Sequence, residues 1–201
     1  MKIIGIDPSL SSTGVTVLDT DLDTLIADQF TIATKPAMGD SRLTMIRYSL
    51  GATFYDQEPQ LAVLESLPFN ARSAGQTGMA QGVIRQILEE NTIPVVFVVP
   101  STLKKFATGS GTVPKGTKGK ARKEPMLSVF AELNGYRVED DNQVDAYFLA
   151  LMGCAALQGK GRLHGVQHMI DTMKGEPWGA DLLDEAEQDM PQRLAYPSPR
   201  S

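Results

Sequence analysis

The sequence predicts an α/β fold in which a mixed, largely parallel sheet is flanked by helices. Runs of β-branched and aliphatic residues alternate with longer segments whose apolar residues recur at helical spacing. The chain of 201 residues is 42% hydrophobic, which is enough to bury one substantial core. Residues 61–65 form an apolar run that ends in an acid, a pattern typical of a buried strand whose end opens into a site.

Strand-forming residues dominate the start of the chain. Residues 2–6 and 15–18 are rich in β-formers and are separated by a turn, so we expect a hairpin. Residues 29–34 alternate apolar and polar side chains and predict a third strand. The apolar runs at 61–65 and 93–99 supply two more strands, each preceded by a helical segment, and this order indicates parallel pairing.

Helical spacing of apolar residues occurs between and after these strands. One such segment starts at Ser41, after a Gly-Asp pair that suits a helix N-terminus. In residues 73–90, Gly75, Gly78 and Gly82 leave a face of small side chains that another element could approach closely. Residues 109–120 are too rich in Gly, Lys and Thr to pack, and they predict a loop. Further helical segments are expected as a short turn after Pro100, near residues 123–133 and over 141–157.

We expect one domain over residues 1–160 and an acidic, Pro-containing extension over 161–201. The extension carries four basic and seven acidic residues together with four prolines, which predicts weak order. The single cysteine, Cys154, lies in an apolar run, which favours a core position and a reducing compartment. There is no signal-peptide pattern and no apolar stretch of membrane-spanning length, so we expect a cytoplasmic protein without membrane contact.

Charge is distributed unevenly along the chain. The net charge of −5 by itself argues against a nucleic-acid partner. Between Lys104 and Lys123, however, the sequence contains no acid, and this segment is the one plausible phosphate-binding surface. Its cationic residues are Lys104, Lys105, Lys115, Lys118, Lys120, Arg122 and Lys123.

Three acids occur at predicted element ends that an α/β sheet brings together. Asp7 ends the first strand, Glu65 ends the fourth, and Asp145 lies in the first turns of the helix over 141–157. Ligands of such sheets gather at the C-terminal ends of the strands. Carboxylate oxygens suit hard divalent cations, which can activate water for phosphodiester hydrolysis. Taken singly, each acid also has a simpler interpretation: a turn cap for Asp7, a solvated side chain for Glu65 and a helix-terminal charge for Asp145.

The motifs that contain these acids resemble those of the RuvC-type Holliday junction resolvases. The resemblance covers about residues 2–157 and leaves open whether the chain is of the bacterial or the bacteriophage type. Its most specific part is the first motif. The three motifs are Gly5-Ile6-Asp7-Pro8 followed by Thr13-Gly14, then Leu64-Glu65 at the end of an apolar strand, then Val144-Asp145-Ala146 in a helix.

This resemblance implies a ribonuclease H-like fold and a metal-dependent endonuclease that cleaves branched DNA, above all four-way junctions. It implies two Mg²⁺ or Mn²⁺ ions, with Asp7 shared between them and Glu65 and Asp145 each completing one site. Symmetric cleavage of a two-fold junction implies a homodimer, for which the small-residue face of 73–90 is a candidate interface. The host would be a bacterium or a phage-infected cell.

One ligand position departs from the family pattern. The family places an acid or a histidine three residues before the last Asp, where this chain has Asn142. Asp141 lies four residues before Asp145, on nearly the same helix face, so the fourth ligand is either Asp141 or Asn142. The resemblance also indicates that Lys104 and Lys123 stabilise charge on the phosphate. For both lysines the alternative is a solvated loop residue.

Further residues are candidates for DNA contact. Phe69 follows Glu65 in a loop where the family carries an aromatic that stacks on a base, and its alternative is a side chain tucked into the core. Arg72 beside it is a candidate phosphate contact. His164 and His168 lack neighbouring cysteines, so we do not expect a zinc site. Sequence-independent contacts to the DNA backbone are expected from Lys105, Lys115, Lys118, Lys120 and Arg122.

Two other function classes compete with a nuclease. An ATP-dependent phosphotransferase of the actin-like fold also begins with a strand that ends in Asp, but it would have Gly soon after Asp7 and further Gly-rich phosphate loops. Here Pro8 follows, and no second loop of that kind is evident. The other rival is a non-catalytic nucleic-acid-binding module or an RNA-processing relative of the same fold.

Overall fold

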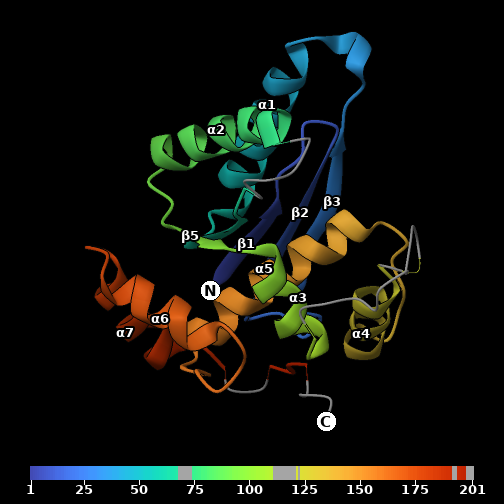
Figure 1. Cartoon of the computed structure of the whole chain (residues 1–201). Coiled ribbons are helices and arrows are strands. Elements are labelled where there is room, and N and C mark those ends of the chain that lie inside the picture. The colour runs from blue at the N-terminus through green and yellow to red at the C-terminus, as the bar shows by residue number, and fades with distance from the viewer. Residues whose placement is uncertain (68–73, 111–120, 122, 192–193, 198–201) are drawn as a thin grey trace.

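The computed structural model describes residues 1–67, 74–110, 121, 123–191 and 194–197, and its centre is a five-stranded sheet (Figure 1). The strands lie in the order β3-β2-β1-β4-β5, so the first strand is in the middle. The strands are β1 Lys2–Asp7, β2 Ser12–Asp19, β3 Ile26–Ala33, β4 Leu61–Glu65 and β5 Val95–Val98.

The pairing of the strands places two of the predicted site residues at one edge. β1 and β2 form the predicted hairpin, with Asp7 opposite Gly14. β2 pairs antiparallel with β3, whereas β1 with β4 and β4 with β5 are parallel. The sheet is mixed as predicted, but it is less parallel than expected, because short turns rather than crossover helices join β1, β2 and β3. Asp7 and Glu65 end neighbouring parallel strands and so share the C-terminal edge.

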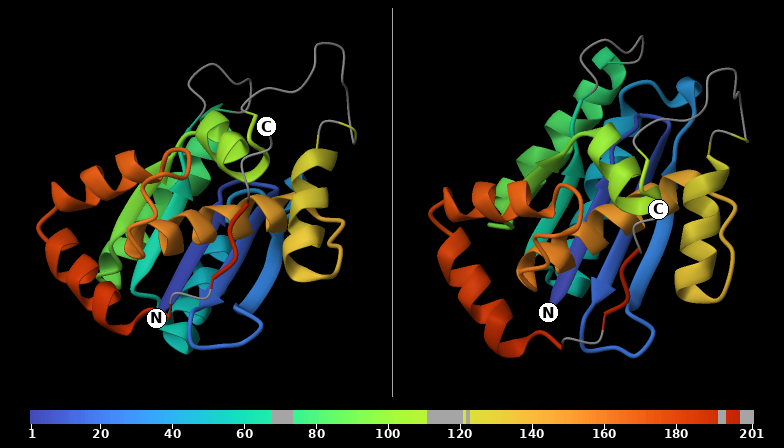
Figure 2. Two further views of the ribbon diagram at one scale, coloured as in Figure 1. Left: turned by 90° about the horizontal axis from the view of Figure 1, so that it is seen from below. Right: turned by 60° about the horizontal axis from the view of Figure 1, so that its bottom comes forward.

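Helices cover both faces of the sheet. The pair α1 and α2 packs on one face, and α5 crosses the strands on the other, flanked by the remaining helices (Figures 1 and 2). Alternate residues of one strand face the two layers, so Ile3 packs beneath α5 while Ile4 packs beneath α1 and α2. The helices are α1 Ser41–Gln57, α2 Ala74–Glu90, α3 Pro100–Thr108, α4 Glu124–Asn134, α5 Asp141–Leu157, α6 Val166–Lys174, α7 Gly179–Asp189 and the 3₁₀ turn η1 Pro36–Met38.

The extension after residue 160 differs from the weak order expected for it. Residues 166–174 and 179–189 form α6 and α7, and both helices bury side chains in the core that also contains α5. Met173, for example, has no exposed surface. The physical reason is that all four prolines lie outside the two helices, while Val166, Met169, Ile170 and Met173 fall on one face of α6. The extension is therefore packed on the same core as residues 1–160.

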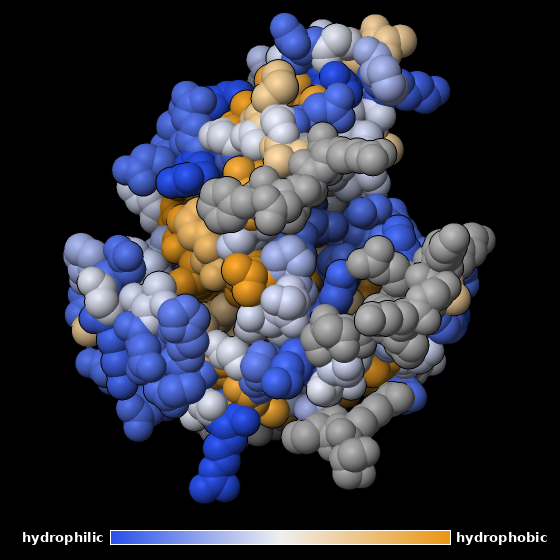
Figure 3. All heavy atoms as spheres, in the orientation of Figure 1, coloured by the Kyte–Doolittle hydropathy of each residue, from blue (hydrophilic) through white to orange (hydrophobic). Residues whose placement is uncertain are grey.

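On the face of the molecule shown in Figure 3, apolar and hydrophilic side chains occupy different regions. Apolar side chains are gathered around β5, where Phe97 is 42% and Val99 is 49% exposed, and hydrophilic residues cover the α6 and α7 region. The guanidinium of Arg85 lies 5.3 Å from the centre of the Phe97 ring. In the described part of the chain, none of the helices has the length and apolar character needed to cross a bilayer.

Candidate active site

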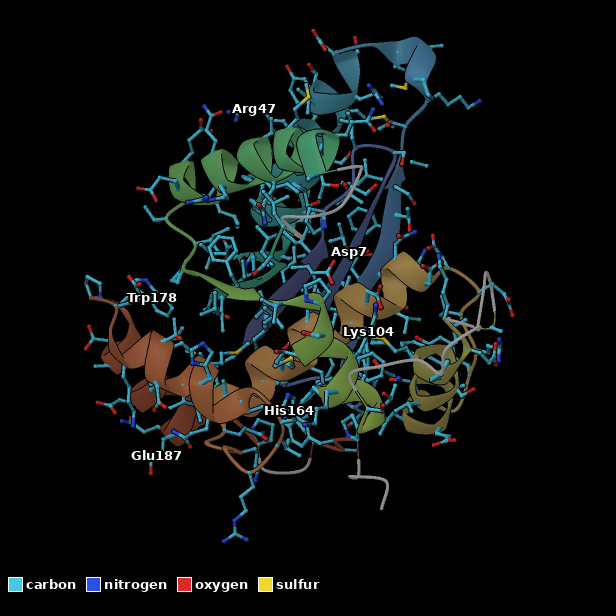
Figure 4. All side chains as sticks on the ribbon, in the orientation of Figure 1. Asp7, Arg47, Lys104, His164, Trp178 and Glu187 are labelled. Atoms are coloured by element: carbon cyan, nitrogen blue, oxygen red, sulfur yellow. The ribbon has the colours of Figure 1, made fainter. Side chains whose placement is uncertain are left out.

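The three predicted carboxylates come together from three elements. Asp7 ends β1, Glu65 ends the neighbouring β4, and Asp145 lies on the second turn of α5, which crosses over β1. The Asp7 side chain points into the space between the sheet and this helix (Figure 4). Each of the three residues is only partly exposed. The charges of Asp7 and Asp145 act on each other, and so do those of Asp145 and Glu65.

Asp7 and Glu65 form a hydrogen-bonded acid pair. Burial, followed by the negative charge of Glu65, raises the pKa of Asp7 well above its ordinary value. A hydrogen bond between the two carboxyl groups adds to the rise for Asp7 and partly offsets the effect of burial on the pKa of Glu65. Burial still raises the pKa of Glu65 to about 7. Without a cation nearby, the pair therefore disfavours two negative charges at once.

Asp145 is the second centre of unfavourable negative charge. Burial raises its pKa to about 8, and the charges of Asp7 and Asp141 add to the rise. The positive charges of Lys104 and Lys123 act in the opposite direction but do not cancel it. The site therefore holds more buried negative charge than its two lysines neutralise.

A cavity of about 470 Å³ opens beside these acids. Both predicted lysines line it, Lys104 from α3 and Lys123 from the N-terminus of α4, and Lys123 forms an ion pair with Asp141. The charge of Lys104 reaches both Glu65 and Asp145. The cavity thus places two cations opposite the carboxylates. Its lining residues are Lys104, Lys123, Met126, Leu127, Asp141, Val144 and Asp145.

The donor set suits a hard divalent cation, although it is not already arranged around one. Buried carboxylates with raised pKa values and too few cationic partners are the groups that a divalent ion would stabilise. Among the described residues, no three His, Cys, Asp or Glu side chains form a ready-made ligand group. In this structure Asp7 hydrogen bonds to Glu65, and Asp141 forms an ion pair with Lys123. Binding of a divalent ion to these carboxylates would compete with both contacts.

The two candidates for the fourth ligand face different surroundings. Asp141 lines the cavity and its charge acts on Asp7 and Asp145. The Asn142 amide nitrogen instead donates to Ser12 Oγ at 2.9 Å and to Asp140 Oδ1 at 2.9 Å. Both residues remain candidates for the fourth ligand. In this structure the Asp141 side chain faces the cavity, whereas the Asn142 side chain is hydrogen bonded to Ser12 and Asp140.

Other site residues went unnoticed in the sequence. Gln81 is buried on α2 and donates from Nε2 to the Glu65 carbonyl oxygen at 2.8 Å, which fixes the backbone at the end of β4. Ser12 and Thr31 hydrogen bond to the start of α5. Of these residues only Asp140, the N-cap of α5, stands where the sequence could have indicated a role, because an acid suits a helix N-terminus. The other contacts depend on tertiary structure.

Of the predicted DNA contacts, Lys105 lies in the part of the chain that the structure describes. Lys105 is exposed on α3, and its charge lowers the pKa of the nearby His164, although burial is the larger cause of that shift. The remaining candidates lie outside the described residues: Phe69, Arg72, Lys115, Lys118, Lys120 and Arg122.

The chain is similar in sequence to known proteins. Residues 3–140 match the family model of the crossover junction endodeoxyribonuclease RuvC. The RuvC protein of Carboxydothermus hydrogenoformans is 34% identical over 164 residues, which are 79% of this chain and 99% of that protein. A Prochlorococcus marinus RuvC is 32% identical over 157 residues, with 76% and 97% covered.

Solved structures share the fold. Thermus thermophilus RuvC aligns with a TM-score of 0.65 at 20% identity, covering 79% of this chain and 97% of that one. The same protein in complex with a Holliday junction substrate aligns with a TM-score of 0.63, again at 20% identity, and covers 75% and 91%. The predicted fold class, a ribonuclease H-like mixed sheet flanked by helices, is confirmed. The chain belongs to the RuvC family of crossover junction endodeoxyribonucleases.

Proposed function

We propose that this protein is a metal-dependent endonuclease that hydrolyses phosphodiester bonds in branched DNA and resolves four-way junctions. The observation that carries the proposal is the set of buried carboxylates from β1, β4 and α5, which lies beside a cavity lined by two lysines. Such a set suits phosphoryl chemistry, where charge must be stabilised on both the attacking and the leaving oxygen. Membership of the RuvC family supports branched DNA as the substrate.

The carboxylates would hold two Mg²⁺ or Mn²⁺ ions. When bound, such ions activate water and stabilise the leaving oxygen of an in-line displacement. Asp7 would be the ligand common to both ions, because it hydrogen bonds to Glu65 on the next strand and its charge acts on Asp145 on the crossing helix. Burial of the three carboxylates keeps competing water away from these ligands. Asp141 and Asn142 are the candidates for an additional ligand.

The chain's own cations would act on the DNA. Lys104 and Lys123 both line the cavity, where they can bind a phosphate and stabilise the charge that develops on it. Lys123 is held by Asp141 in this structure, so its release would accompany binding of a phosphate. Lys105 would contact the DNA backbone from the exposed side of α3. The same role remains a prediction for Lys115, Lys118, Lys120 and Arg122, as does base stacking for Phe69 and a phosphate contact for Arg72.

A homodimer would present two such sites to the two-fold junction. The small-residue face of α2 supports it, because nothing in the described structure lies within 4 Å of a Cβ atom built on Gly75 or Gly82, and Met79 between them is 46% exposed. A close helix–helix contact is what such a face permits. Met79→Glu should shift the sedimentation of the protein from dimer to monomer, whereas Asp56→Asn on the exposed surface of α1 should not.

Cleavage of a synthetic four-way junction with and without added Mg²⁺ tests the proposed activity. Asp7→Asn should bind the junction as wild type does but lower the cleavage rate by at least ~100-fold, because an amide cannot supply the charge of a carboxylate ligand. Asp56→Asn, an exposed acid exchanged in the same way, serves as the control. If Asp7→Asn still cut the junction at the wild-type rate, the proposed mechanism would be wrong.

Fork, flap and structured RNA substrates separate the remaining possibilities. Preference for the four-way junction supports a resolvase, and preference for structured RNA would support an RNA-processing relative. Hydrolysis of ATP without cutting of any nucleic acid would favour the phosphotransferase. Binding without cutting, in the presence of either metal, would favour a non-catalytic module.

A further inference from the structure

The first turns of α5 carry two of the site acids, and the helix backbone lies directly on the sheet at this point. A Cβ atom built on Gly5 would stand 1.9 Å from the Ala146 carbonyl oxygen, and one built on Gly14 would stand 2.0 Å from the Asn142 carbonyl oxygen. These contacts set how closely α5 approaches β1 and β2. They do not set the rotation of the helix about its axis or its shift along that axis.

Hydrogen bonds are directional, so they can fix the rotation of α5 and its shift along its axis. Thr31 on β3 donates from its hydroxyl to Asp140 Oδ2 at 2.6 Å. Asp140 Oδ1 accepts from the Asn142 backbone N–H at 3.0 Å and from the Asn142 amide at 2.9 Å. The same amide nitrogen donates to Ser12 Oγ on β2 at 2.9 Å. Four side chains from two strands and one helix start are thus tied to one another.

A second pair of bonds holds the next residue of the helix. The carbonyl oxygen of Gln143 accepts from Thr16 Oγ1 at 3.1 Å and from Gln29 Nε2 at 3.2 Å. Thr16 is fully buried on β2, and Gln29 lies beside it on β3. The first turn of α5 is therefore bound to the β2–β3 hairpin through both its N-cap and its backbone.

The orientation of the Asn142 amide follows from its partner. An ionised carboxylate only accepts hydrogen bonds, so the atom that faces Asp140 must be the donor Nδ2. This nitrogen is turned toward Ser12 and the hairpin. Asp141, the preceding residue, lines the cavity together with Lys123 and Asp145. Asp141 therefore faces the cavity, whereas the Asn142 side chain bonds to Ser12 and Asp140.

We infer that Ser12, Thr31, Asp140 and Asn142 form a polar latch that fixes the first turn of α5, and that Asn142 is a positioning residue rather than a metal ligand. This inference rests on the proposed function. Asp141 then supplies the additional carboxylate beside Asp7, Glu65 and Asp145. Partners of this kind, which orient ligands without touching the metal, change metal affinity by about 10–100-fold when removed.

Removal of one hydroxyl tests the latch. Thr31→Val preserves the shape of the side chain but removes the donor to Asp140. It should weaken Mn²⁺ binding, measured by electron paramagnetic resonance without DNA, by about 10-fold. It should also lower kcat while leaving the KM for the junction unchanged, and Thr31→Ser should restore both values. Thr53→Val is the matched control, because that buried hydroxyl bonds only to the Ser49 carbonyl oxygen within α1.

Mn²⁺ binding by Asn142→Asp distinguishes a positioning role of Asn142 from a role as a metal ligand. A latch predicts weaker Mn²⁺ binding, because the new carboxylate cannot donate to Asp140 and repels it. A ligand at this position predicts tighter binding, because a negative charge has been added, and that result would overturn the inference. Combining Thr31→Val with Asn142→Ala should cost little more than either change alone, since both break one network.

The outcomes distinguish the latch from the proposed function. A wild-type protein that neither binds Mn²⁺ nor cuts a junction contradicts the proposed function. A wild-type protein that does both, with Thr31→Val indistinguishable from Thr53→Val, overturns the latch alone. Melting temperatures establish that each variant is folded. Should Thr31→Val fail to fold, Ser12→Ala removes a single hydrogen bond and must change Mn²⁺ affinity in the same direction for the latch to stand.

Discussion

The acids of the site differ from ordinary surface carboxylates because they share a small, partly buried volume. Asp145 has a pKa of about 8 and Glu65 of about 7, in both cases with burial as the largest cause. A group that holds its proton more tightly in the folded state than in the unfolded state makes unfolding easier as the pH rises. The raised pKa values of Glu65 and Asp145 therefore lower the stability of the metal-free protein at neutral and alkaline pH.

The melting temperature of the metal-free protein should fall as the pH rises from 5 to 8.5. Between the ordinary pKa of Asp145 and its raised value, the folded state binds more protons than the unfolded state, so the free energy of unfolding decreases with pH. Asp145→Asn, a neutral substitute, should melt at least ~2–4 °C above wild type at pH 8.5, a difference that corresponds to about 1 kcal/mol. Equal melting temperatures at that pH would contradict this account of the site.

Addition of Mg²⁺ should counteract the fall in the melting temperature of the wild-type protein with rising pH. Ligand carboxylates must be deprotonated to bind a metal ion, so metal affinity rises with pH through the pKa values of Glu65 and Asp145. Stabilisation by Mg²⁺ should accordingly be larger at pH 8.5 than at pH 6, measured by differential scanning calorimetry. Asp145→Asn should show a smaller effect at both values.

At the scale of elements, the contact of α5 with β1 and β2 decides where the acids lie. Gly5 and Gly14 face the backbone of the helix rather than its side chains, and a backbone atom cannot move aside as the end of a side chain can. Gly153 on α5 shows a milder version of the same contact, because a Cβ atom there would stand 2.9 Å from a methyl group of Ile3.

Gly5→Ala and Gly14→Ala should each destabilise the protein by at least ~1–3 kcal/mol, because the added methyl group would overlap the α5 backbone. The change should also displace α5 and reduce cleavage. Gly51→Ala on α1 is the control: nothing lies within 4 Å of its Cβ position, so it should stabilise the helix by about 0.5–1 kcal/mol. Urea unfolding measures all three, and similar values for Gly5→Ala and Gly51→Ala would contradict the close approach.

At the scale of the whole molecule, the C-terminal helices extend the core on the α5 side of the sheet. The family model match ends at residue 140, one residue before α5 begins, and the Carboxydothermus protein matches 79% of this chain. The burial of residues from α6 and α7 in the same core as α5 gives these helices a structural role. Because α5 carries Asp141 and Asp145, the packing of α6 and α7 against the core of α5 also stabilises the position of these two acids.

Met173→Ala should cost about 2–5 kcal/mol, since Met173 is fully buried between α6 and the core. His168→Ala, on the exposed face of the same helix, should change stability by no more than ~0.5 kcal/mol. Chemical denaturation of the two variants distinguishes a packed extension from a dispensable one. Equal stabilities would show that α6 adds nothing to the fold.

The sequence by itself determined the strands, most helices, the fold class and the three acids at element ends. These features depend on local patterns: β-rich runs, helical spacing and a motif around Asp7. The range of α5, Asp141–Leu157, was predicted without error, because its apolar stripe is wide and its N-terminal acids mark its start. The order of α6 was not predicted, because the four prolines and clustered acids of residues 161–201 as a whole outweighed four apolar residues at helical spacing within 166–174.

Only the tertiary structure decided how the acids are coupled and what surrounds them. The bond between Asp7 and Glu65 requires two strands that are far apart in sequence to be neighbours. The pairing of Lys123 with Asp141 and the bonds of Asn142 to Ser12 and Asp140 join α4 to α5 and α5 to β2. Hydrogen bonds and charge interactions depend on distance and direction in space, and these follow from packing rather than from position along the chain.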